Sequence, residues 1–368
     1  MTDRSMRAGV LREVGVPFSI EEVELLAPTD GRVVVRTHAS PFCSTDVHNW
    51  SGALAKIPPT ILGHASIGEV VEVGPGVVTV QVGQRVLVPG TPECGSCYYC
   101  SVGEPWQCSE LFDLGGVYPD VARGADGALI SGAGCVGGYA ELMNVSQNQV
   151  FPIESDLGSD VLSLLGCGIT TGYGAVVNAA RVRPEETVAV FGAGHLGLWM
   201  MQAARVARAG TVAVVEPDAD RREVARSLGA DVVIDPSVED AVERVRDLTE
   251  GRGADVTLEA SSSTGAQRDA VLAARRGGRT VLSGLERGDA EVVIPQVPLS
   301  LQSRSVLSVQ NGNVRMRRDV PACIRLLERG LLDASAILTH RYPLERLDDA
   351  REASKNHDDL SGLIVLAG

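Results

Sequence analysis

The sequence has no apolar run long enough to cross a membrane and no targeting signal at its start. Its first ten residues, Met1–Val10, include Asp3, Arg4 and Arg7 and lack the continuous apolar stretch of a secretory signal. Internal repeats and low-complexity tracts are absent as well. We therefore expect a cytoplasmic protein.

Positive charge is scarce: 33 lysines and arginines stand against 47 aspartates and glutamates, a formal net charge of −14. An acidic surface does not attract nucleic acid or anionic membranes, so neither is expected as a partner. The acidity is explained most simply by solubility. Hydrophobic residues make up 44% of the 368 residues, which is the composition of a globular protein with room for two domains.

Disulfides are uncommon in the cytosol, so the eight cysteines need another explanation. Half of them, Cys94, Cys97, Cys100 and Cys108, lie on one short segment. Four thiolates close a tetrahedron around zinc and leave no open position, which is typical of a structural site. The alternative, a set of buried thiols without a ligand, is disfavoured by this spacing.

The pattern of the chain changes along its length. Residues 1–165 are rich in Gly, Pro and Val and contain short β-like runs, for example at 33–35, 70–73 and 85–88. From Thr187 onward, buried strand patterns alternate with helix patterns, which predicts a parallel sheet covered on both faces. The expected strands are 187–191, 211–216, 232–235, 255–259, 280–283 and, at the end of the chain, 363–366; the expected helices are 196–209, 220–227, 238–249 and 266–274.

A dinucleotide-binding pattern follows the first of these strands. Gly192, Gly194 and Gly197 form G-x-G-x-x-G between a strand and a helix. The first glycine permits the tight turn, the second lets a pyrophosphate approach the backbone, and the third lets helix and strand pack closely. The helix N-terminus around Leu196 offers N–H groups to the phosphates.

The end of the next strand bears on the choice of cofactor. Glu216 lies nineteen residues after Gly197. An acidic side chain there accepts hydrogen bonds from the adenosine ribose and repels a 2′-phosphate, so NAD is favoured over NADP. Arg221 and Arg222 are the counter-argument, because arginines in this region can bind a 2′-phosphate.

Three further residues, Cys43, His64 and Cys167, are widely separated. Taken alone, each is more simply a core cysteine or a satisfied histidine. Their neighbourhoods favour metal ligands: Cys43 begins Cys-Ser-Thr-Asp-Val-His, His64 lies in Gly-His-Ala-Ser-Ile-Gly, and Cys167 lies in Leu-Leu-Gly-Cys-Gly-Ile-Thr-Thr-Gly-Tyr-Gly.

These segments, the four-cysteine segment and the glycine pattern occur in the order seen in zinc-dependent alcohol dehydrogenases of the medium-chain dehydrogenase/reductase superfamily. The chain resembles that family over nearly its full length, and the segment around Cys167 looks most like the animal-type and glutathione-dependent formaldehyde dehydrogenase branch. The resemblance implies an α/β fold, with a Rossmann doubly wound parallel sheet inserted in a GroES-like, mostly β catalytic domain. The expected domains are 1–168 (catalytic, first part), 169–309 (Rossmann) and 310–368 (catalytic, C-terminal part).

The resemblance also implies an active site with NAD and two zincs per subunit. Cys43, His64 and Cys167 would bind catalytic zinc, which acts as a Lewis acid on an alcohol oxygen while a hydride passes to the nicotinamide. By motif, the roles of the neighbouring residues also carry over. Thr45 contacts the substrate oxygen, His48 relays the proton, Asp46 orients the ligand His64, and Thr171 lies beside the nicotinamide.

The chain departs from the family pattern at several positions. Ala65 replaces the usual Glu after the ligand histidine, which puts ligand exchange at this zinc in doubt. Ser44 replaces an Arg or His that contacts the pyrophosphate, and no C-terminal Arg is found for the same task. The phosphates would then rely on the helix N-terminus and on His195, which could equally be a solvated loop residue.

The expected substrate pocket is also unusual, since Gly90 stands where relatives often have a bulky aromatic residue. A roomier pocket suggests an alcohol, aldehyde or ketone larger than ethanol. By loose alignment, the remaining lining residues are Leu54, Ile130, Leu285 and Gln310.

Two other functions stay open at this point. One is the reduction of a C=N or conjugated C=C bond in specialised metabolism, with NAD(P)H. The other is a non-catalytic NAD(H)-binding protein. The intact Thr45/His48 pair argues against the first, and the complete ligand set argues against the second. The family suggests a homodimer or homotetramer.

Overall fold

The computed structural model describes residues 4–54, 58–115, 117–285 and 289–366. The chain forms two compact units. Unit 1 comprises Met1–Cys167, Arg315–Val320 and Leu338–Gly368, and unit 2 comprises Gly168–Val314 and Pro321–Ile337. The chain first passes from unit 1 to unit 2 after residue 167, one residue before the expected boundary. The second expected boundary, at residues 309/310, differs more from the structure. Residues 321–337 belong to unit 2 and not to the C-terminal part of the catalytic domain.

Unit 1 is mostly β structure, in agreement with its sequence pattern. A closed barrel follows the order β1-β2-β7-β8-β4, and a second sheet follows the order β10-β6-β5-β3-β18-β17, with β9 paired to β3. Alternating burial along β1 places Met6, Ala8 and Val10 in the barrel core. The strands of unit 1 are β1 Ser5–Leu11, β2 Ser19–Leu25, β3 Arg32–Phe42, β4 Thr60–Ile61, β5 Ser66–Val73, β6 Arg85–Val88, β7 Asp120–Arg123, β8 Leu129–Gly132, β9 Leu142–Ser146, β10 Phe151–Pro152, β17 His340–Pro343 and β18 Gly362–Val365.

Short helices connect these strands and position the candidate site residues. The helices of unit 1 are α1 Ser44–Trp50, α2 Tyr98–Ser101, α3 Ser109–Phe112, α4 Ser159–Ser163 and α12 Leu347–Asn356. Helix α11, Met316–Glu328, begins in unit 1 and passes into unit 2 at Pro321. This passage within one helix explains why a single boundary near residue 310 does not describe the chain.

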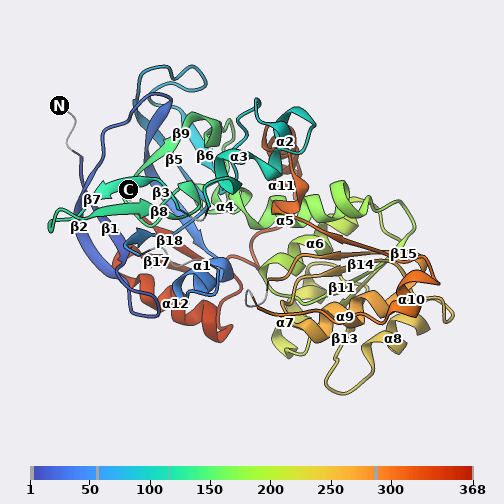
Figure 1. Ribbon diagram of the computed structural model, residues 1–368. Helices are drawn as coiled ribbons and strands as arrows, with labels where there is room; N and C mark the ends of the chain where they lie inside the picture. Colours follow the sequence, from blue (N-terminus) through green and yellow to red (C-terminus); the bar gives the residue numbers. More distant parts are fainter. Residues whose placement is uncertain (1–3, 55–57, 116, 286–288, 367–368) are drawn as a thin grey trace. The chain divides into compact units, whose positions relative to one another are not determined.

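Unit 2 is a Rossmann-type α/β unit. Its sheet has the order β13-β12-β11-β14-β15-β16, and every pairing is parallel. In Figure 1, α6 lies on one face of this sheet and α8 and α9 on the other. The strands are β11 Thr187–Phe191, β12 Thr211–Val215, β13 Val232–Ile234, β14 Ala254–Glu259, β15 Ala274–Leu282 and β16 Ser305–Ser308; the helices are α5 Gly168–Gly174, α6 His195–Val206, α7 Ala219–Ser227, α8 Ala241–Asp247, α9 Thr264–Ala273 and α10 Gln296–Ser300.

Among the described residues, no single helix is long and apolar enough to cross a bilayer. Two consecutive helical segments with a bend between them, Ser159–Gly166 and Gly168–Ala180, are together long and apolar enough, judged by length and composition alone.

Candidate functional site

The three dispersed residues Cys43, His64 and Cys167 come together in unit 1. Cys43 precedes the first residue of α1, His64 lies just before β5, and Cys167 follows a turn of 3₁₀ helix at 164–166. Their possible ligand atoms all lie within 4.8 Å of one another, and His64 Nε2 is 3.4 Å from Cys167 Sγ. Two thiols and one imidazole that converge in this way fit a zinc ion and leave one position open.

Hydrogen bonds, burial and neighbouring charges shift the pKa values of two of these groups in opposite directions. The pKa of Cys43 lies well below its usual range because of hydrogen bonds with Cys167 and His64, against the opposing effect of burial. Burial would lower the pKa of His64, but the adjacent Asp46 carboxylate outweighs this and raises it well above its ordinary value. The thiolate of Cys43 is a form that binds zinc, whereas His64 must give up the proton on Nε2 before that nitrogen can bind a metal.

Asp46 fixes the orientation of His64. Its carboxylate is fully buried, and Oδ1 lies 3.2 Å from His64 Nδ1 and accepts a 3.2 Å hydrogen bond from the Gly63 N–H. A proton on Nδ1 leaves Nε2 directed at the Cys167 sulfur, which is the arrangement that a metal ligand needs.

Tyr139 also contacts Asp46, and the sequence motifs did not indicate this residue. Its hydroxyl donates to Asp46 Oδ2 at 2.9 Å. Burial, and then the neighbouring Asp46, raise the pKa of Tyr139 well above its ordinary value, so the phenol keeps the proton that it donates. Motif spacing could not indicate a contact between these two residues, because Tyr139 lies 93 residues from Asp46 in the sequence.

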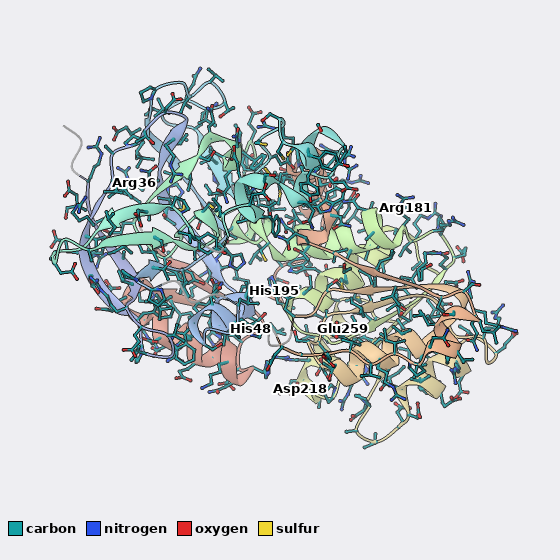
Figure 2. The ribbon with its side chains drawn as sticks, in the orientation of Figure 1. Arg36, His48, Arg181, His195, Asp218 and Glu259 are labelled. Atoms are coloured by element: carbon teal, nitrogen blue, oxygen red, sulfur yellow. The ribbon has the colours of Figure 1, made fainter. Side chains whose placement is uncertain are left out.

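Helix α1 carries the other residues predicted for the chemistry. The Thr45 hydroxyl lies 3.6 Å from Cys43 Sγ, and His48 lies one turn further along the helix, half-buried (Figure 2). Ser44 is exposed at the first position of the helix. Thr45 is therefore placed beside the candidate ligands, within unit 1.

Small residues enclose the His64 segment. A Cβ atom built on Gly90 would lie 2.8 Å from the His64 carbonyl oxygen, and one on Gly134 would lie 3.0 Å from His64 Cβ. Ala65 is buried, and a Cβ atom built on Gly166 would lie 2.8 Å from the Cβ of Ala65. This packing leaves little room for the glutamate that the family usually has at position 65.

The remaining predicted pocket residues are divided between the two units. Ile130 is fully buried in the core of the barrel, so its assignment to the pocket was wrong: its side chain packs against core residues. Leu54 belongs to unit 1 and is half-exposed. Leu285 and Gln310 belong to unit 2, where Leu285 is exposed and Gln310 precedes the 3₁₀ turn Asn311–Asn313.

The second cluster is the four-cysteine segment of unit 1. The sulfur atoms of Cys94, Cys97, Cys100 and Cys108 all lie within 4.8 Å of one another. Backbone N–H groups also point at the sulfurs: the Cys97 N–H donates to Cys94 Sγ at 3.3 Å, and the Cys100 N–H to Cys97 Sγ at 3.5 Å. Four sulfurs with such donors fit a closed, structural zinc site.

This segment also holds the beginning of α11, a contact that the sequence did not predict. The Arg315 guanidinium donates to the Gly103 carbonyl at 2.9 Å, and the Met316 N–H donates to the Glu93 carboxylate. Burial raises the pKa of Glu93, although the Met316 N–H opposes the rise. The four-cysteine segment is therefore tied to the part of α11 that belongs to unit 1.

The glycine loop of unit 2 has the geometry of a phosphate-binding turn. Gly192 has φ +99°, which favours glycine. A Cβ on Gly197 would lie 1.9 Å from the Gly192 carbonyl oxygen, so the loop and α6 pack too closely for a side chain. A Cβ on Gly194 would meet only Arg221 Nη1, at 3.9 Å, which leaves an open cradle beside the N-terminus of α6, where Leu196 is the second residue.

His195, labelled in Figure 2, is the first residue of α6 and is half-buried. A Cβ on Gly168 would lie 1.8 Å from its Nε2, and its ring meets Trp199 edge-on, with the ring centroids 6.3 Å apart. The side chain thus packs against the start of α5, which disfavours the alternative of a fully solvated loop residue.

Glu216 lies directly beneath the glycine loop. Its buried carboxylate accepts hydrogen bonds from the Ala193 N–H at 2.7 Å and the Asp218 N–H at 3.0 Å. Arg222 donates to the Glu216 carbonyl at 2.8 Å and pairs with Asp235 at 2.9 Å. Of the two arginines, Arg221 is therefore the one whose guanidinium lies near the cradle.

Thr171 lies in α5 of unit 2, where its hydroxyl donates to Asn311 Oδ1 at 2.9 Å. The metal set and the glycine loop thus belong to different units, and each is complete within its own unit.

Comparisons with known proteins agree with this division. The model of the alcohol dehydrogenase GroES-like domain matches residues 29–155, and that of the zinc-binding dehydrogenase domain matches residues 196–329. The chain is 31% identical to an NDMA-dependent alcohol dehydrogenase of Amycolatopsis methanolica over 98% of both chains. It is 33% identical to an S-(hydroxymethyl)glutathione dehydrogenase of a Synechocystis species, covering 94% of this chain and 95% of the relative. The crystal structure of benzyl alcohol dehydrogenase from Acinetobacter calcoaceticus is similar with a TM-score of 0.92 at 27% identity, over 99% of both chains.

Proposed function

Because the chain belongs to the zinc-dependent alcohol dehydrogenases of the medium-chain dehydrogenase/reductase superfamily, it is an alcohol or aldehyde oxidoreductase. We propose that it transfers a hydride between an alcohol larger than ethanol and NAD, with a catalytic zinc at Cys43, His64 and Cys167 and a structural zinc at the four-cysteine segment. The observation that carries the proposal is the convergence of three ligand atoms within 4.8 Å from segments far apart in the sequence.

The residues around the ligands have defined tasks in this proposal. Bound zinc would supply a Lewis acid for the substrate oxygen, and bound nicotinamide would accept or return the hydride. Asp46 holds the ligand His64 in one orientation. Thr45, beside Cys43, binds the substrate hydroxyl through its own hydroxyl group, and His48 carries the released proton toward solvent.

NAD is the proposed form of the nicotinamide cofactor. Glu216 supports it, because this residue follows β12 directly and its buried carboxylate contacts the glycine loop at Ala193, where a 2′-phosphate would meet a like charge. The guanidinium of Arg221 near Gly194 argues in the opposite direction, so the comparison of NAD with NADP is part of the test. Gly192, Gly194, His195, Leu196 and Gly197 form the proposed phosphate cradle, and Thr171 is the proposed neighbour of the nicotinamide.

Substrate size is inferred from Gly90, which puts no side chain beside the ligand His64. The name of the benzyl alcohol dehydrogenase neighbour supports an aromatic or cyclic alcohol. Leu54, Leu285 and Gln310 remain proposed pocket residues. A bulky alcohol fills such a space with apolar contacts that ethanol cannot make.

We also propose a homodimer or homotetramer in the cytoplasm. Val293, Val297 and Leu301 are 74%, 60% and 81% exposed and are spaced four residues apart along and beside α10. Such apolar exposure supports burial against another copy. The cytoplasmic location is supported by the four-thiol site, which needs reduced cysteines.

An NAD-linked screen over alcohols of graded size tests the proposal. We expect kcat/KM for benzyl alcohol or cyclohexanol to exceed that for ethanol by at least about tenfold, which corresponds to about 1.4 kcal/mol. NAD should exceed NADP by a similar factor, and Glu216→Ser should reduce that gap. The screen includes NDMA as an alternative oxidant because one relative is named for it.

Cys43→Ala is the matched negative variant, which should lose the activity. Protein that holds two zincs yet oxidises none of the alcohols, or reduces only C=N or C=C bonds, would contradict the proposal. Equal use of ethanol and benzyl alcohol would contradict the size argument alone.

A further inference from the structure

We infer that Tyr139 is a positioning residue of the catalytic metal site: its hydroxyl holds Asp46, and Asp46 holds the ligand His64. The inference rests on the proposed catalytic ligand set, and it assigns a task to a side chain that lies outside the motifs of that set.

The ring of Tyr139 is locked in place. It is fully buried, stacks on Phe42 with ring centroids 5.4 Å apart and planes 3° apart, and meets Phe18 edge-on at 6.5 Å. Its backbone is fixed too, since its N–H donates to the Leu62 carbonyl at 3.0 Å and its carbonyl accepts from the Gly9 N–H at 2.8 Å. A fully buried ring that contacts two aromatic neighbours and is fixed at its backbone keeps its hydroxyl in one position.

The segment that carries His64 runs directly against this tyrosine. Gly63 has φ +84°, and a Cβ there would lie 2.9 Å from both the backbone N and Cδ1 of Tyr139. The neighbouring Gly138 N–H donates to the Gly63 carbonyl at 2.8 Å. Position 63 therefore requires glycine so that Tyr139 and the His64 segment can lie side by side.

Four hydrogen-bond partners surround the Asp46 carboxylate. Oδ1 lies 3.2 Å from both the Gly63 N–H and His64 Nδ1, while Oδ2 accepts from the Cys43 N–H at 3.2 Å and from Tyr139 at 2.9 Å. The Tyr139 contact is the shortest of the four and is charge-assisted. The phenol also lies 3.3 Å from the Pro41 carbonyl, but its single proton favours the nearer, charged oxygen.

Loss of this hydroxyl would leave Oδ2 with one long hydrogen bond in a site that water does not reach. The carboxylate could then rotate toward the Cys43 N–H and loosen its hold on His64 Nδ1. Groups that orient a metal-binding histidine typically change metal affinity by about 10–100-fold when removed.

The competing interpretation is that Tyr139 only fills the core, and the chain offers a matched control. Tyr342, also in unit 1, donates from its hydroxyl to the buried carboxylate of Asp359 at 2.6 Å. Neither Tyr342 nor Asp359 belongs to a cluster of possible metal ligands in the described part of the chain. Tyr342→Phe thus removes the same kind of hydrogen bond away from both metal sets.

The experiment measures the loss of zinc from purified holoprotein into an excess of chelator, followed with a metal-sensitive dye and without substrate. Tyr139→Phe keeps the ring and its stacking. We expect one zinc to leave about tenfold faster and the other to leave at the wild-type rate. Cys43→Ala identifies which of the two is the catalytic zinc. Tyr342→Phe should leave both rates unchanged, even if it lowers the melting temperature. Replacement of the catalytic zinc by cobalt adds a spectroscopic readout: its visible bands should shift in Tyr139→Phe alone.

Wild-type rates for both zincs in Tyr139→Phe, with a loss of thermal stability like that of Tyr342→Phe, would overturn the inference. If Tyr139→Phe does not fold, 3-fluorotyrosine incorporated at position 139 provides a stronger donor of the same shape. It should slow the loss of the catalytic zinc, and an unchanged or faster loss would overturn the inference. Inactivity of the wild-type protein toward alcohols leaves this test intact, whereas a single zinc per wild-type chain would remove the basis of both proposals.

Discussion

Gly90 has a packing constraint in addition to its proposed effect on the size of the pocket. The sequence suggests that a large residue there would narrow the pocket, but a Cβ at this position meets the His64 carbonyl oxygen at 2.8 Å. Strain of about 1–3 kcal/mol is typical when an atom is forced into a packed site. We therefore expect Gly90→Ala and Gly90→Phe to lower kcat/KM for ethanol and benzyl alcohol alike, by about tenfold or more, and to weaken zinc binding.

Steady-state kinetics with both alcohols, together with zinc analysis, check this expectation. The control is Gly265→Ala in α9, where a Cβ would lie 3.6 Å from its nearest neighbour, Ser263 Oγ. A Gly90→Phe enzyme that keeps two zincs and gains preference for ethanol would show that position 90 acts through pocket size and not through packing against the His64 segment.

Also at the scale of residues, the sequence motifs identified the metal ligands more reliably than the residues that surround the ligands. Cys43, His64, Cys167 and Asp46 could be proposed because each lies in a recognisable local pattern. Tyr139 could not, because its role depends on a hydrogen bond across 93 residues. Ile130 was misassigned for a related reason: a loose alignment cannot tell the two faces of a short strand apart.

The four-cysteine segment has little apolar core of its own. The proposed zinc ligation by its four sulfurs and its hydrogen bonds with Arg315 and Met316 stabilise it. Removing one of four ligands should therefore cost more stability than removing a ligand from the open set. We expect Cys100→Ala to lower the free energy of unfolding by more than about 3 kcal/mol, and Cys43→Ala to lose one zinc and the activity while keeping the fold.

Thermal unfolding and zinc analysis of the two variants separate these effects. Cys135→Ala removes a buried thiol outside both metal clusters and should keep two zincs. Cys100→Ala with wild-type stability would show that the hydrogen bonds of Arg315 to Gly103 and of Met316 to Glu93 suffice without the metal.

Strands of the parallel sheet were the elements most accurately predicted. β11 agrees with the expected 187–191 because a buried strand before a glycine turn has a distinct pattern. β16 was missed, since its residues are partly exposed and polar at both ends. The passage of α11 from unit 1 to unit 2 at Pro321 could not be predicted, because helix periodicity says nothing about which neighbours a helix packs against.

At the scale of the whole molecule, unit 2 exposes three apolar side chains on and beside α10, which we call the α10 strip. Val293, Val297 and Leu301 are 74%, 60% and 81% exposed. At about 25 cal/mol per Å² of buried apolar surface, covering such a strip by a second copy favours association. Light scattering should therefore give a mass of two or four times 38.7 kDa.

Leu301→Glu should shift the protein toward the monomer, because a carboxylate buried in an apolar contact would lose its hydration. Val238→Glu is the matched control, since Val238 is 80% exposed on unit 2 and lies outside this strip. A wild-type mass of one chain, or an equal effect of the two substitutions, would show that the strip does not join subunits, and the apolar exposure around α10 would then need another partner.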